Sequence, residues 1–159
     1  MALRNIVTEG DDVLRKRARE VTEINDRIRG ITEDMVQTMR AEYGLGLAAP
    51  QVGILRRIIV VEVDGQLYQL INPEIVETRG EQYEEEGCLS VPGLVGRVRR
   101  PQYVKIKGSS PEGESVEYEG EDLLAIVFCH ECDHLDGVLY TDKADNVRSA
   151  AEDEEETEE

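Results

Sequence analysis

The chain has 159 residues, and its 18 basic against 35 acidic side chains give a formal net charge of −17. That length suits one domain whose core needs no disulfide support, while the charge argues against nucleic acid or an anionic membrane surface as a partner. No segment approaches the ~18 apolar residues of a membrane span, and the N-terminus lacks the apolar core of a signal peptide, so we expect a cytoplasmic protein.

Two helices are expected in the N-terminal third. Asp11-Asp12 followed by VLRKRA predicts a short helix with acid at its start and base at its end, as the helix dipole prefers. A second helix is expected from Asn25 to about Tyr43, with Gly44 at the position of a C-cap. Its apolar residues recur at spacings of three and four, namely Ile28, Ile31, Met35 and Met39.

The segment GLGLAAPQVG, residues 44–53, follows the second helix. Its glycines and alanines leave the backbone open to close approach by a ligand or by another part of the chain. A tight connection between a helix and a strand would have the same composition. Gln51 is the only side chain in the segment that can form hydrogen bonds.

Several short strands are expected in the middle of the chain. Arg57–Val63 and Gln66–Ile71 are β-branched runs joined by Asp64-Gly65, a strong hairpin signal. Further extended pieces are expected over Glu74–Thr78, after Pro73, and then over Val98–Lys107 and Val116–Glu119. Between them, residues 81–93 (EQYEEEGCLSVPG) are interpreted as a mixed acidic loop that carries Cys88.

The stretch Leu123–Gly137, LLAIVFCHECDHLDG, predicts a helix that is apolar on most of its circumference and is therefore buried at the centre. It contains both histidines of the chain, His130 and His134, four residues apart and thus on one helical face. Buried imidazoles need partners, and one metal ion would satisfy both. Glu131 would then stand where a general base for a water is needed. The alternative is two ordinary helix histidines.

The three cysteines offer further ligands. An odd number of cysteines indicates a reducing compartment, where thiols serve metals or chemistry rather than crosslinks. Cys129 and Cys132 could form a zinc or redox pair, but they flank His130 and point away from the histidine face, so we interpret them as small core residues. A catalytic metal usually has three protein ligands and a water. No third histidine remains and a carboxylate could come from many places, but Cys88 has the most distinctive surroundings.

The end of the chain carries seven acidic residues among the last eight, EDEEETEE. Such a run cannot offset its ordering entropy. We therefore expect a single catalytic domain over residues 1–149 and a disordered acidic tail over residues 150–159. An early helix, several antiparallel strands and a late buried helix make the expected fold class α+β.

Three blocks of the sequence, in order, resemble the signature motifs of the peptide deformylase family. They are GLGLAAPQ (44–51), EGCLS (86–90) and HECDH (130–134), and the similarity extends from about Ile6 to Asp142. It includes INP at 71–73 and V-R-R at 98–100. The resemblance implies antiparallel strands wrapped around a central metal-binding helix. It also implies a metal-dependent hydrolase that removes the N-formyl group from the N-terminal formylmethionine of newly synthesised proteins.

The resemblance also implies roles for individual residues. Cys88, His130 and His134 would hold ferrous iron, for which zinc, nickel or cobalt could substitute. Glu131 would be the acid–base residue, and the side chain of Gln51 with the backbone N–H of Leu89 would stabilise the oxyanion. The substrate backbone would be aligned by Gly46, Glu86 and Gly87, and the methionine pocket would be lined by Leu45, Leu123, Ile126 and Val127.

Some features depart from the family pattern. Cys129 stands where many members have Gln, and Pro50 where some have Thr. The resemblance implies that the substrates are N-formylmethionyl peptides of nascent chains. Some members dock on the ribosome through a basic C-terminal helix. The acidic tail of this chain does not resemble such a helix, so docking through the tail is not expected. Arg100 falls on a family arginine that would either pair with Asp133 behind the site or be solvated.

Two competing interpretations remain at this level. A metallopeptidase of the HExxH type would need a downstream Glu or His as its third ligand. A structural metal-binding module would use Cys88, Cys129, Cys132 and the histidines, but a closed site would leave no water position and no role for Glu131.

Overall fold

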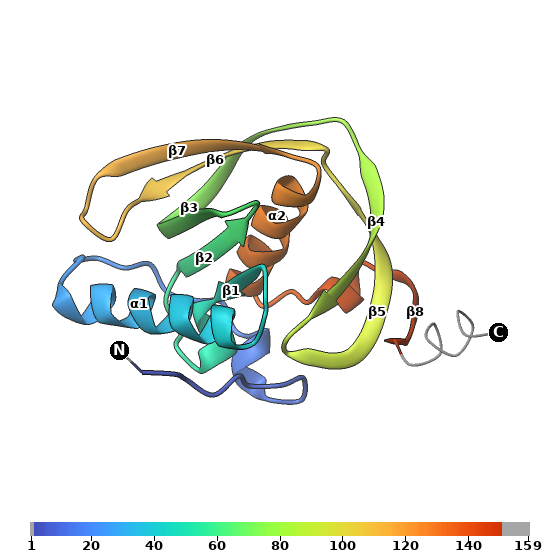
Figure 1. The fold of residues 1–159 in the computed structure, drawn as a ribbon, viewed down its shortest axis with the longest axis horizontal. Helices are drawn as coiled ribbons and strands as arrows, with labels where there is room; N and C mark the ends of the chain where they lie inside the picture. Colours follow the sequence, from blue (N-terminus) through green and yellow to red (C-terminus); the bar gives the residue numbers. More distant parts are fainter. Residues whose placement is uncertain (1, 151–159) are drawn as a thin grey trace.

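Two antiparallel sheets and two α-helices make up the fold, which is α+β as expected (Figure 1). The structure is a computed structural model that describes residues 2–150. Helix α2 lies between the two sheets, and α1 packs below the larger one in the view of Figure 1. In the part of the chain that is described, no helix is long and apolar enough to cross a membrane.

The larger sheet has the strand order β1-β2-β3-β6-β7, with every neighbouring pair antiparallel. The predicted hairpin at Asp64-Gly65 is confirmed: both residues have positive φ angles, 53° and 78°, and Val63 pairs with Gln66. Strand β3 is longer than expected because it continues through Pro73 after a register shift. The strands are β1 (Gly46–Ala48), β2 (Ile58–Val63), β3 (Gln66–Arg79), β6 (Tyr103–Ser109) and β7 (Ser115–Glu121).

The smaller sheet corrects two expectations. Residues 82–88 are not a loop but strand β4 (Gln82–Cys88), which pairs with β5 (Val91–Arg100). The expected single strand Val98–Lys107 is two strands, β5 and β6, in different sheets. The chain breaks between them at Pro101, which cannot donate a ladder hydrogen bond. A third strand, β8 (Asp145–Ser149), which the sequence analysis did not anticipate, pairs with β5.

Helix α1 (Asp26–Ala41) confirms the second predicted helix. Its N-cap is Asn25, whose side chain accepts a hydrogen bond from the backbone N–H of Ile28. The first predicted helix is a short 3-10 turn, η1 (Asp12–Arg15), capped by Asp11. Two further 3-10 turns are η2 (Ala49–Val52), which follows β1, and η3 (Tyr140–Asp142), which follows α2.

Helix α2 (Leu123–Leu135) is the buried central helix that its apolar circumference predicts. The two helices pack on opposite faces of strand β2. Successive side chains of β2 point alternately toward α2 and toward α1. Ile59 and Val61 pack with the core around Phe128 of α2, while Ile58 and Val60 pack with the apolar residues of α1. A strand covered on both faces is β-branched throughout, as the run IIVV is. The acidic tail expected over 150–159 lies, beyond Ala150, outside the described residues.

Candidate active site

Helix α2 supplies both expected histidine ligands and the expected acid–base residue, Glu131. The rings of His130 and His134 lie with their centroids 5.0 Å apart, as residues one turn apart should. Both side chains and Glu131 between them are buried. Burial lowers the pKa of His134, which keeps its imidazole neutral, the form that can coordinate a metal.

Cys88 joins these histidines from the end of β4. Its Sγ lies 3.3 Å from Nε2 of His134, and the ligand atoms of Cys88, His130 and His134 all lie within 4.8 Å of one another. One thiolate and two imidazoles suit zinc, iron, nickel or cobalt, so this donor set fits a divalent transition metal. Among residues 2–150 the cluster does not include Cys129 or Cys132, which pack with the apolar core instead.

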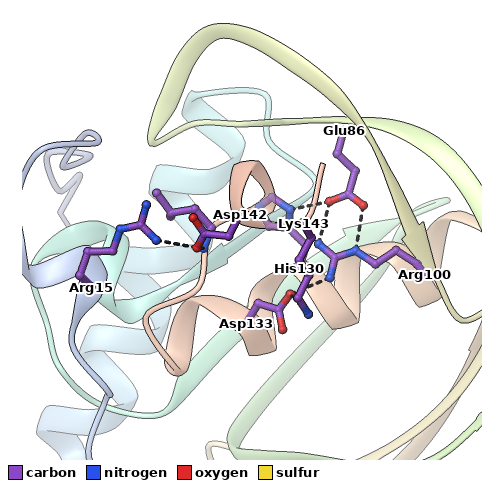
Figure 2. A network of polar contacts seen from close by, with 8 residues as sticks. Arg15, Glu86, Arg100, His130, Asp133, Asp142 and Lys143 are labelled. Carbon is purple, nitrogen blue, oxygen red and sulfur yellow. Dashed lines mark hydrogen bonds and ion pairs between the residues drawn. The ribbon is translucent and has the colours of Figure 1, made fainter. Parts of the chain in front are cut away.

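A network of ions fixes the orientation of His130 (Figure 2). Nδ1 of His130 lies 2.9 Å from Oε1 of Glu86, and Arg100 holds both oxygens of Glu86 at 2.9 and 3.0 Å. Arg100 also donates to Asp133 at 2.6 Å, and Lys143 lies 3.0 Å from the same oxygen. With its Nδ1–H donated to Glu86, His130 presents Nε2 to the cluster.

The electrostatics of Glu86 depend on this network. Burial alone would raise the pKa of Glu86, but the hydrogen bonds from His130 and Arg100 outweigh burial and lower it below its ordinary value. The Arg100 side chain is buried and pairs with Asp133. Of the two alternatives for Arg100, the structure thus has this ion pair and not a solvated side chain. The contact between Glu86 and His130 was missed by the sequence analysis, which gave Glu86 only a role toward substrate.

Glu131 has a free carboxylate oxygen inside the site. Burial raises the pKa of Glu131 to about 7, against the opposing effect of His130, and Oε1 has no hydrogen-bond partner in the described structure. The absence of a side chain at Gly46 makes room for the carboxylate, since a Cβ there would lie 2.6 Å from Oε2 of Glu131. A buried carboxyl with a pKa near 7 and one unused oxygen can exchange a proton with a bound water.

Gln51 is oriented by its own backbone neighbourhood. Its amide oxygen accepts a hydrogen bond from the N–H of Ala48 at 2.9 Å, so its NH₂ group faces the other way. That NH₂ lies 3.6 Å from Sγ of Cys88 and 3.2 Å from Oγ of Ser90. Segment 44–53 is thus both a connection to β2 and the source of an amide donor at the cluster.

A cavity of about 390 Å³ opens beside the cluster. It is lined by every expected site residue except His134. The sequence analysis gave no site role to five further lining residues. These are Glu85, Val91, Gly93 and Leu94 on β4 and β5, together with Gly44 before β1.

Comparison with known proteins agrees with these features. Residues 3–150 match the family model for polypeptide deformylase. The peptide deformylase of Thermoanaerobacter pseudethanolicus is 56% identical over 156 residues, covering 98% of this chain and 97% of the relative. That of Acetivibrio thermocellus is 51% identical over 154 residues, covering 97% and 89%.

Solved structures of peptide deformylases have the same fold as this chain. The crystal structure of peptide deformylase from Thermotoga maritima superposes with a TM-score of 0.87 at 43% identity, covering 90% of this chain and 98% of that one. Sequence motifs, fold and a Cys/His/His cluster beside a cavity thus coincide in one protein. The chain therefore belongs to the peptide deformylase family, whose members are metal-dependent hydrolases that remove the N-formyl group from nascent polypeptides.

Proposed function

We propose that Cys88, His130 and His134 together hold one divalent metal ion, which is ferrous iron in the cell and can be replaced by zinc, nickel or cobalt. The observation that carries this proposal is the convergence of one sulfur and two imidazole nitrogens within 4.8 Å beside a cavity that Cys88 and His130 line. Such an ion, when bound, supplies Lewis-acid chemistry that makes a water nucleophilic near neutral pH. A formamide needs such help because it is not activated.

The substrate would bind as an extended strand between two sheet edges. Strand β1 ends one side of the larger sheet and β4 ends one side of the smaller, so each offers unpaired backbone groups. Gly46, Glu86 and Gly87 stand on these edges and align the formylmethionyl backbone. The methionine side chain fills the apolar part of the cavity, which is lined by Leu45, Leu123, Ile126 and Val127.

Three groups of this chain would act on the reacting atoms. Glu131 takes a proton from the attacking water at its free Oε1 and returns it to the leaving amine. The NH₂ of Gln51 and the backbone N–H of Leu89 donate to the oxygen that becomes negative as the formyl carbon turns tetrahedral. Each preorganised donor of this kind contributes roughly 3–4 kcal/mol. Glu86 acts indirectly, by holding the tautomer and orientation of His130.

The setting of this reaction is also part of the proposal. N-formylmethionyl peptides of nascent chains are made in the cytoplasm, so we place the enzyme there and close to the ribosome. The last eight residues carry seven acidic side chains, so we do not expect the tail to dock on anionic RNA. With a net charge of −17, the protein is not expected to bind nucleic acid or an anionic membrane.

The test is to purify the protein with and without oxygen, measure the metal content of each sample, and assay hydrolysis of a formyl-Met peptide. Ferrous iron beside a thiolate is open to oxidation at the iron or at Cys88. We expect the anaerobic sample to contain iron, to be highly active and to decay in air, whereas nickel or cobalt preserves activity and removes the decay. An anaerobic sample that carries only zinc and loses nothing in air would overturn the iron assignment alone.

A further inference from the structure

Lys143 stands at the outer end of a line of ion pairs that begins at His130 (Figure 2). Its Nζ lies 3.0 Å from Oδ2 of Asp133, and the same oxygen accepts a hydrogen bond from Nη1 of Arg100 at 2.6 Å. Nε and Nη2 of Arg100 donate to Glu86, whose Oε1 lies 2.9 Å from Nδ1 of His130. A continuous series of contacts thus joins the Lys143 ammonium to an expected metal ligand.

This line of ion pairs runs from the interior to the surface. Its side chains are 4% exposed at Glu86, 3% at Arg100, 20% at Asp133 and 47% at Lys143. An isolated pair at the surface contributes little, but this one shares its carboxylate with a buried guanidinium. The line holds two carboxylates and two cations, so its charges balance. Without Lys143, one buried guanidinium would face both carboxylates.

The turn that carries Lys143 is fixed by other contacts. Lys143 follows η3, in which the carboxylate of Asp142 accepts a hydrogen bond from Arg15 at 2.6 Å. Tyr140 of the same turn is only 1% exposed, and its ring stacks on that of His130 with the centroids 6.0 Å apart. The backbone at Lys143 therefore does not depend on its own ammonium, and a substitution there removes the ion pair while the turn persists.

We propose that Lys143 is a positioning residue of the metal site. By holding Asp133, it keeps the Arg100 guanidinium directed at Glu86, because the guanidinium is a rigid planar fork whose contacts move together. Glu86 in turn holds the ring of His130 with Nε2 toward the cluster. The inference rests on the ligand set proposed above. Charge alone predicts the opposite sign, since an ammonium repels a divalent cation and its removal would strengthen metal binding.

The first test measures the affinity of the metal-free protein for cobalt by competition with a chelator. Lys143→Met should bind cobalt roughly five-fold more weakly, which is less than the about 10–100-fold lost with a direct partner of a ligand. Lys143→Arg keeps the cation and should restore the affinity. Lys107→Met is the matched control, because it removes the same charge from an exposed pair with Glu74, 3.8 Å away, and should change nothing.

A double-mutant cycle ties the effect to the line of ion pairs. If Lys143 acts through Asp133, Lys143→Met should have no further effect on cobalt affinity in an Asp133→Asn background. An equal loss in both backgrounds would show that Lys143 acts by another route and would overturn the proposal.

A second measurement needs no metal. Proton NMR of the metal-free protein should show the Nδ1–H of His130 protected from exchange with water by its bond to Glu86, and this protection should weaken in Lys143→Met. A merely structural role predicts a lower melting temperature with unchanged protection and affinity. Unchanged or tighter cobalt binding in Lys143→Met would overturn the positioning role alone. If the unmodified protein binds no cobalt, the proposed ligand set is overturned, and the positioning role with it.

Discussion

The larger sheet buries apolar side chains, and on β2 it does so on both faces, whereas strand β4 of the smaller sheet, which carries Cys88, is exposed or half-buried at all but one residue. Along β2 the buried residues are Ile58–Val61 and Val63. Along β4 the one buried residue is Glu86, and its carboxylate is paired with Arg100. Strand β2 is thus stabilised by apolar burial, whereas β4 and the end of β5 are tied to α2 by a buried ion network.

This difference matters because the candidate site lies where the two regions meet. Helix α2, packed on the larger sheet, contributes His130 and His134, and the smaller sheet contributes Cys88. The position of Cys88 relative to the histidines therefore depends on the contacts among Glu86, Arg100 and the helix. Substitutions in the two regions should separate loss of function from loss of stability.

The largest effect is expected for Cys88→Ala, which removes the only ligand from the smaller sheet. Two imidazoles alone bind the metal weakly, so both metal content and deformylation should be lost while the fold persists. Metal analysis, the formyl-peptide assay and circular dichroism on one sample would check this. A fully metallated, active Cys88→Ala enzyme would contradict the ligand assignment.

The second largest effect is expected for Arg100→Met, which removes the ion pairs of Arg100 with Glu86 of β4 and with Asp133 of α2. It leaves the buried carboxylate of Glu86 without its guanidinium partner, and removing one member of a buried pair costs about 3–5 kcal/mol. Urea unfolding would measure the loss. Arg99→Met is the matched control on the same strand, because Arg99 is exposed and its nearest carboxylate oxygen, on Glu81, is 3.6 Å away. Equal effects of the two changes would refute the difference between the sheets.

Smaller effects are expected at the two cysteines on the core side of α2. Cys129→Ala and Cys132→Ala leave only small cavities, so each should lower the free energy of unfolding by about 1–2 kcal/mol and keep the metal. Burial raises the pKa of the Cys129 thiol to about 11, so that thiol stays protonated and unreactive. Loss of metal in Cys132→Ala with retention in Cys88→Ala would favour the structural-metal interpretation.

The smallest effect is expected from removing residues 150–159. Those residues carry seven acidic side chains and no large apolar one, so they should bury little surface, and activity and melting temperature should stay almost unchanged. Thermal unfolding of the full and shortened chains would test this. A drop of many degrees would mean that the tail docks on the body.

Sequence patterns were sufficient where burial follows a simple period. The apolar circumference of Leu123–Leu135 predicted the central helix, and the β-branched runs around Asp64-Gly65 predicted the β2–β3 hairpin. The motif HECDH needed only the helical repeat to bring His130 and His134 together. The match of EGCLS to a known family suggested Cys88, which residue patterns alone left as one candidate among several.

Strand β4 could not be predicted because its one buried position carries charge. Glu86 is buried in place of an apolar residue, so β4 does not show the alternation of a half-buried strand. Three consecutive glutamates, residues 84–86, are typical of a solvated loop. Glu86 is buried here because Arg100 and His130 pair with its carboxylate. Such pairing joins residues far apart in the chain and leaves no local period.

The most direct test of the account is Glu131→Ala, measured for metal content and for hydrolysis of a formyl-Met peptide on the same sample. Glu131 is placed to move protons and is not among the three clustered ligands. The account predicts near-normal metal content with turnover reduced by at least about 10²-fold. Substantial activity in a fully metallated Glu131→Ala enzyme would contradict it.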